Sequence, residues 1–260
     1  MASASFDTYV SGRSLLHNWT PRLKLCSLGL LMFAFAAVRQ LSLVLPMLAV
    51  AGLIYAASEL PLPYLLKRLR YPGLFILMVV LVLPFGSGDT VMAQWGPLVL
   101  RQEGLMTMLL VVGRFLSILT LGFVLLGTTP FLTLLRALRS LGLPTLLADM
   151  TLLTYRYLFE TADMLSTMQT SMRLRGFGHR KGWLRVEGKT LSQLAGLLGT
   201  LLIRSYERSE KIYKAMQLRG YGRLKASQLV TRQPVDRISV LLTGLCAIIA
   251  TAFVIAEITF

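Results

Sequence analysis

Long apolar runs constrain the fold of this 260-residue chain more than any other feature of its sequence. Five runs, residues 23–38, 41–57, 73–85, 104–127 and 238–259, have few charges, and several approach the roughly 20 residues that a helix needs to cross a bilayer. Apolar side chains make up 55% of the chain and charged ones 15%, too little polar surface for a soluble fold of this size. We therefore predict an all-α polytopic membrane protein with about five transmembrane helices.

Basic residues predict how the chain is oriented in the membrane. The net charge is +15, and 18 of the 27 lysines and arginines lie between Arg136 and Arg237. The link at 59–72 is also basic, whereas the segment 86–101 has a single basic residue. Because positive segments stay on the cytoplasmic side, we predict an inner-membrane protein with a cytoplasmic N-terminus and an external C-terminus. The segment 86–101 would be an external loop.

The same pattern predicts three parts of the chain. Residues 1–127 form an N-terminal membrane part with about four spans, 128–237 a cytoplasmic domain, and 238–260 the last transmembrane helix. Within the cytoplasmic domain we predict two long helices with thin apolar stripes, from about 146 to 174 and from about 190 to 218.

Two signals delimit a shorter helix at the start of the cytoplasmic domain. Thr128 and Thr129 precede Pro130, which predicts a hydroxyl cap followed by proline at the first helical position. Gly142 and Pro144 predict where this helix stops.

An internal repeat marks the ends of the two long helices. Residues 171–178 and 215–222 align at an offset of 44, and each copy places an arginine and a glycine, Arg175-Gly176 and Arg219-Gly220, at a helix end. Either copy alone is what ordinary helix capping would produce. Two matching copies favour two equivalent partners, each of which receives one arginine in a carboxylate-lined groove.

These Arg-Gly helix ends resemble the paired Ala-Arg-Gly motifs of the T components of energy-coupling-factor transporters. This chain departs from that motif by having leucine in place of alanine in both copies. The segment 204–216 looks most like the CbiQ branch, which serves cobalt or nickel uptake. The resemblance continues in chain order over five more stretches, Thr20–Lys24, Arg101–Leu105, Thr128–Pro130, Ala137–Pro144 and Leu153–Tyr157.

The resemblance implies a non-catalytic scaffold with two amphipathic coupling helices in an ATP-driven importer. Arg175 and Arg219 would dock two ATP-binding-cassette ATPases, and Gly176 and Gly220 would close the helix ends. The ATPases would bind ATP, so this chain would need no cofactor. The scaffold would also hold a substrate-binding S component in the bilayer, for cobalt or nickel uptake and hence cobalamin biosynthesis. A scaffold shared by several vitamin S components is the alternative.

Two further residues in the matched stretches, Arg156 and Pro144, are candidates for structural or coupling roles. Arg114 is a third, because it interrupts an apolar run. Such a charge is usually paired or functional, and we expect a contact with a backbone carbonyl or with Glu103, or else snorkelling to the interface. We interpret Lys24 as a surface charge, whose replacement should affect ATPase docking or transport far less than that of Arg175 or Arg219.

Other function classes have weaker support. The Gly-Lys-Thr at 188–190 lacks the earlier glycine of a phosphate-binding loop. His17 and His179 lack neighbouring ligands, so no metal site is expected. No catalytic cluster and no nucleic-acid motif stands out. A lipid-associated membrane enzyme or assembly factor stays open as the alternative of another class.

Overall fold

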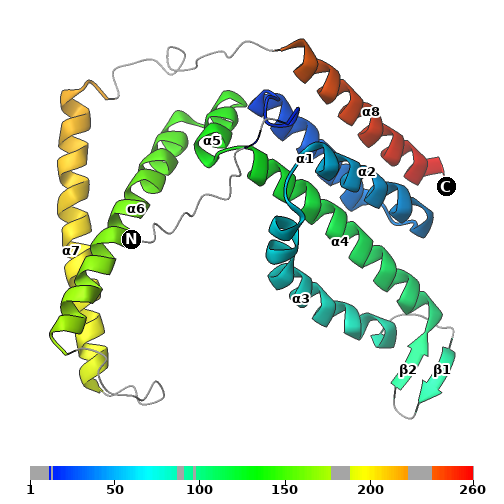
Figure 1. Ribbon diagram of the computed structural model, residues 1–260, viewed down its shortest axis with the longest axis horizontal. Coiled ribbons are helices and arrows are strands. Elements are labelled where there is room, and N and C mark those ends of the chain that lie inside the picture. The colour runs from blue at the N-terminus through cyan, green and yellow to red at the C-terminus, as the bar shows by residue number, and fades with distance from the viewer. Residues whose placement is uncertain are drawn as a thin grey trace. The chain divides into compact units, whose positions relative to one another are not determined.

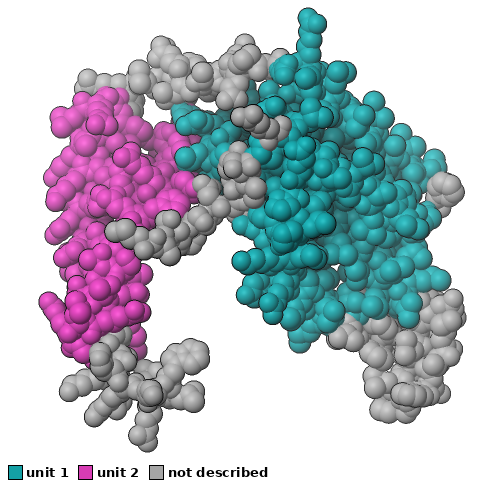
Figure 2. Space-filling view, in the orientation of Figure 1, with its two compact units in different colours: residues 1–141, 233–260 teal, residues 142–232 magenta. Residues whose placement is uncertain are grey.

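The computed structural model describes residues 12, 14–86, 91–95, 98–176, 188–221 and 236–259. The chain divides into two compact units (Figure 2). Unit 1 comprises residues 1–141 and 233–260, and unit 2 comprises residues 142–232. Unit 2 is therefore a continuous insertion in the sequence of unit 1.

Unit 1 consists mainly of helices, as the sequence predicted (Figure 1). The helix α1 packs against α8 and α4, while α2 and α3 also pack on α4. One 3-10 turn, η1 (Leu41–Leu43), leads into α2. The helices of this unit are α1 (Pro21–Ala37), α2 (Val44–Ala57), α3 (Leu62–Gly86), α4 (Gln102–Thr128), α5 (Phe131–Ser140) and α8 (Arg237–Thr259).

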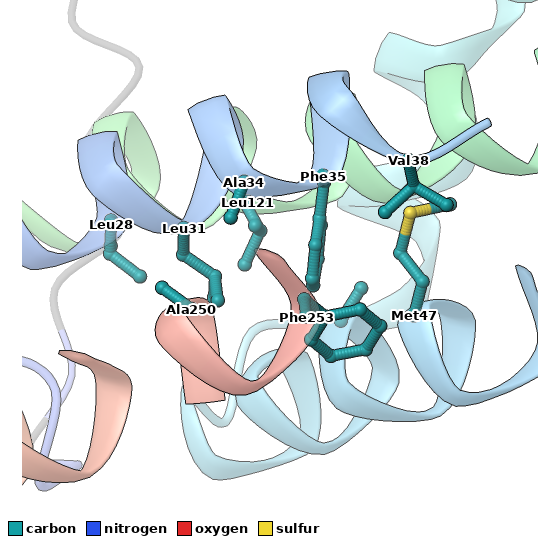
Figure 3. Packing of buried hydrophobic residues seen from close by; sticks show 10 residues of the cluster. Leu28, Leu31, Ala34, Phe35, Val38, Met47, Leu121, Ala250 and Phe253 are labelled. Atoms are coloured by element: carbon teal, nitrogen blue, oxygen red, sulfur yellow. The ribbon is translucent and has the colours of Figure 1, made fainter. Parts of the chain in front are cut away.

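The core of unit 1 joins the first and last helices of the chain (Figure 3). Phe35 of α1 meets Phe253 of α8 edge to face, with ring centroids 5.1 Å apart. At the other end of the pair, the backbone N–H of Thr20 donates to Ser239 Oγ over 3.1 Å. The two helices therefore run parallel, side by side. Leu121 of α4 closes the same cluster and is fully buried.

Two segments of unit 1 differ from the prediction. A basic link and a short apolar run were expected over 59–85, but α3 runs unbroken from Leu62 to Gly86 through Pro72. Packing of α3 along α4 offsets the backbone hydrogen bond that the proline removes. The expected loop at 86–101 contains two short antiparallel strands, β1 (Val91–Trp95) and β2 (Leu98–Arg101), which satisfy each other's backbone groups.

Apolar side chains cover much of the outside of unit 1. Phe33 is 81% exposed, and Leu45 and Leu241 are similarly exposed. Soluble monomers rarely expose contiguous apolar surface of this kind. Among the described residues, the helical segments Gly104–Thr128 and Arg237–Thr259 are long and apolar enough to cross a bilayer. The apolar helical segment Leu41–Ala57 is shorter, and the number of five spans stays a prediction.

Unit 2 contains the two long helices, α6 (Thr145–Leu174) and α7 (Gly188–Leu218). Their C-terminal ends lie where the repeat predicted. Tyr221 Oη, just beyond the end of α7, donates to Asp149 Oδ2 near the start of α6 over 3.3 Å. Arg208 and Glu160 pair farther along, so α6 and α7 run antiparallel. The predicted cytoplasmic domain begins earlier than unit 2, because α5 groups with unit 1.

Candidate docking site at the two helix tips

The two long helices end with the same backbone geometry. Arg175 follows the last residue of α6 and Arg219 the last residue of α7. Each arginine N–H donates to the carbonyl four residues earlier over 3.2 Å. The next residue is a glycine with positive φ in both cases, +89° at Gly176 and +79° at Gly220. The repeat in the sequence is thus a repeat in conformation.

The end of α7 shows why glycine is required there. The N–H of Tyr221 donates to the carbonyl of Met216 over 3.0 Å, and that of Gly220 to Gln217 over 2.9 Å. These two bonds are the Schellman pattern, which places the glycine in the left-handed region. The matching bond of α6 joins the N–H of Gly176 to Arg173 over 3.0 Å. Backbone bonds close each tip, so the arginine side chain is not needed as a cap.

Each tip presents one cation beside one uncovered apolar side chain. Arg175 and Arg219 are both exposed, and no hydrogen bond or ion pair of their side chains is found within the described part of the chain. The preceding leucines are 86% exposed at Leu174 and 90% at Leu218. An unpaired guanidinium next to an exposed leucine is suited to a partner groove with carboxylates and an apolar wall.

The tips lie at opposite ends of the helix pair. Tyr221 contacts Asp149 at the start of α6, whereas Arg175 follows the end of α6. The 26 residues of helix between positions 149 and 175 correspond to roughly 39 Å at 1.5 Å per residue. One groove cannot receive both tips at that separation. The arrangement therefore offers two docking points of equal geometry.

The middle of unit 2 holds Arg156, one of the predicted candidates. Its guanidinium lies 5.7 Å from the ring centroid of Tyr157, and that of Arg208 lies 5.6 Å from the same ring. Arg208 also pairs with Glu160. The two contacts of Arg208 join α7 to α6, whereas Arg156 and Tyr157 both lie on α6. Pro144 immediately precedes α6, and its carbonyl accepts from Ala148 N–H over 3.1 Å.

Arg114 of α4 contacts a backbone carbonyl in unit 1. Its guanidinium donates to the carbonyl oxygen of Val38, at the C-terminal end of α1. That carbonyl lies beyond the hydrogen-bonded turns of α1, and a cation there also complements the helix dipole. A carbonyl was one of the two partners expected from the sequence. The side chain of Glu103, the other, lies outside the described residues.

Lys24 was interpreted wrongly as a surface charge, because its side chain is 1% exposed. Its ammonium donates to the carbonyl of Leu16 over 2.9 Å, to Thr129 Oγ1 over 3.0 Å, and to Thr128 Oγ1. The hydroxyls predicted to cap α5 bind this lysine instead, and Pro130 at the N-cap makes no side-chain cap bond. Nothing in the sequence around Lys24 indicates these partners, which lie 104 and 105 residues later.

Comparisons with known proteins identify the family of this chain. A family model described as "CbiQ: Cobalt transport protein" matches residues 12–229. The chain is 31% identical to the "Energy-coupling factor transporter transmembrane protein EcfT" of Brevibacillus brevis, over 88% of this chain and 90% of that protein. It is 27% identical to the protein of the same name from Limosilactobacillus fermentum, over 97% of each. The resemblance stated from the Arg-Gly repeat is confirmed, and the chain belongs to the CbiQ family.

Proposed function

We propose that this protein is the transmembrane scaffold, or T component, of an energy-coupling-factor importer. It couples ATP hydrolysis by two partner ATPases to movement of a membrane S component that binds the cargo. The observation that carries this proposal is the pair of Arg-Gly tips, which share one geometry at opposite ends of an antiparallel helix pair. The names of the relatives also support it.

The chemistry of the tips supports docking to proteins rather than catalysis in this chain. Each tip offers an exposed guanidinium, Arg175 or Arg219, beside an exposed leucine. A guanidinium can bind a carboxylate with two parallel hydrogen bonds, and the leucine adds apolar area. Two ATPase subunits, each with an acidic groove, would match the two tips.

We further propose that unit 1 lies in the cell membrane with about five spans. The length of α4 and α8 and the exposed apolar side chains of unit 1 support this. The excess of basic residues from 136 to 237 supports a cytoplasmic unit 2, a cytoplasmic N-terminus and an external C-terminus.

For the cargo we propose cobalt or nickel ions, and the family description, which names cobalt transport, supports the first of these. The ion would be bound by the S component and would pass through the complex as substrate. Uptake of labelled Co²⁺ and Ni²⁺ by cells with and without this protein tests the proposal. Equal uptake in the two strains would contradict it and favour a scaffold for organic cargo.

Affinity purification of the tagged protein in mild detergent, with mass spectrometry of its partners, tests the scaffold function. We expect two ATPase copies and one further membrane subunit per scaffold. The double variant Arg175→Ala, Arg219→Ala should insert normally but lose the ATPases. The matched control is Lys214→Ala, which removes a cation of α7 whose pair with Glu210 is exposed. A double variant that keeps both ATPases would refute docking by the tips.

A further inference from the structure

A buried polar cluster, named here the Lys24 clamp, lies at one end of unit 1. It consists of Lys24, the carbonyl of Leu16, and the hydroxyls of Thr128 and Thr129. Lys24 is 1% exposed, and both threonines are below 5%. The clamp joins three parts of the chain: the segment before α1, the first turns of α1, and the end of α4.

Every donor of the lysine has an acceptor in this clamp. The ammonium has three N–H groups, and three oxygens accept from it. Thr128 gives its own hydroxyl proton to the carbonyl of Val124, so its oxygen faces Lys24 as an acceptor. None of the three partners is a carboxylate. A buried charge held by neutral oxygens depends strongly on their geometry, because any displaced oxygen leaves a donor unpaired.

The clamp lies where the chain passes from unit 1 towards unit 2. Thr129 is the residue between the end of α4 and the N-cap of α5, and α5 leads directly into unit 2. After unit 2, the first described element of unit 1 is α8. There Ser239 Oγ accepts from the N–H of Thr20, and Thr243 Oγ1 from Trp19 Nε1 over 3.3 Å. The start of α1 is thus hydrogen-bonded both to the joint between α4 and α5 and to the first turns of α8.

We propose that Lys24 is a positioning residue that fixes the joint between α4 and α5 to α1, so that movement of unit 2 is passed on to the helices of unit 1. This inference rests on the proposed scaffold function. Without the clamp, the joint bends when the ATPases move unit 2, and the movement is lost before it reaches α1 and α4. ATPase docking at the tips is unaffected, because the tips lie in unit 2.

Hydrogen exchange of the whole complex tests the proposal without knowledge of the cargo. The scaffold with its ATPases is placed in lipid nanodiscs, and exchange is measured with and without a non-hydrolysable ATP analogue and Mg²⁺. In the wild type, we expect the nucleotide to change exchange in both units. In Lys24→Met, the nucleotide-dependent difference in hydrogen exchange should remain in unit 2. In α1 and α4 this difference should become about tenfold smaller, because three charge-assisted hydrogen bonds are lost.

Two threonine variants make the test specific to the clamp. Thr129→Val removes one hydrogen-bond acceptor with little change in side-chain shape. It should partly reduce the nucleotide-dependent difference in hydrogen exchange of unit 1. The double variant Lys24→Met, Thr129→Val should show the same difference in exchange of unit 1 as Lys24→Met alone, since both changes break the same interaction. Thr129→Ser keeps the hydroxyl and should behave as the wild type.

The outcomes separate the two proposals. A Lys24→Met complex whose unit 1 responds as in the wild type overturns the role of the clamp and leaves the scaffold function intact. If the Lys24→Met complex does not assemble, the Thr129→Val complex takes its place. A Thr129→Val complex whose unit 1 shows the wild-type difference in exchange also overturns the role of the clamp. A wild-type scaffold that binds no ATPase overturns the scaffold function, and the role of the clamp falls with it.

Discussion

The same substitution, glycine to alanine, should have opposite effects inside α7 and just beyond its end. Gly220 has a φ of +79°, and a Cβ there would meet no atom within 4 Å, so strain in the backbone is the whole effect. Alanine in the left-handed region costs about 1 kcal/mol. Gly199 lies inside the helix and also has open space around it. Alanine there should stabilise the helix by about 1 kcal/mol.

Amide hydrogen exchange of the purified chain measures both effects. A change of about 1 kcal/mol alters a local opening equilibrium about fivefold. In Gly220→Ala, the amide of Tyr221, which is bound to the carbonyl of Met216, should exchange about fivefold faster. In Gly199→Ala, amides of the following turn should exchange about fivefold more slowly.

An asparagine variant serves as the control for conformation. Gly220→Asn should have a smaller effect than Gly220→Ala, because asparagine tolerates the left-handed region better than other residues with a side chain. If Gly220→Ala left the exchange of Tyr221 unchanged or slowed it, the positive φ of Gly220 would not be what stabilises the tip.

Three further predictions concern other contacts. Arg175→Ala and Arg219→Ala should each weaken the docking of one ATPase by about 2 kcal/mol, or about 30-fold in affinity, as measured by titration of the purified ATPase. Equal loss of both ATPases in either variant would contradict two separate docking points. Gly113→Ala should lower the midpoint of thermal unfolding in detergent, because a Cβ there would overlap Cγ1 of Val44. The expected loss of stability is about 1 to 3 kcal/mol, and an unchanged midpoint would refute the close approach of the two helices. Arg208→Ala should change stability by less than about 1 kcal/mol, since its ion pair is about 40% exposed; a larger loss by the same assay would show that the pair is essential to the contact of α6 and α7.

The helix tips could be predicted because their signals are local. A helix end depends on a few consecutive residues, and the glycines after Arg175 and Arg219 specify the left-handed turn by themselves. The C-terminal residues of both long helices, Leu174 and Leu218, therefore agree with the sequence analysis. Which partners the tips bind stays a proposal, because it depends on proteins outside this chain.

Lys24 could not be placed in this way. Its hydroxyl partners Thr128 and Thr129 are 104 and 105 residues away, and no residue of the first helix indicates that they are its partners. A lysine at the start of an apolar run resembles an ordinary interfacial charge, so the local pattern favoured an exposed side chain. The same limit applies to Pro72, where packing of α3 on α4 continued a helix that the local pattern predicted to break.

The pairing of α1 with α8 has a consequence for the biosynthesis of the protein. The two residues just before α1 that hydrogen-bond to α8 are 219 and 224 positions away from their partners in the sequence. At a translation rate of about 5 to 20 residues per second, α1 waits about 10 to 45 s before its partner emerges from the ribosome. During that time its face with Leu28, Leu31 and Phe35 has no α8 to cover it. Unit 1 therefore closes only after α8 has been made, and a ribosome that stalls within unit 2 leaves this helix exposed to lipid and to membrane chaperones.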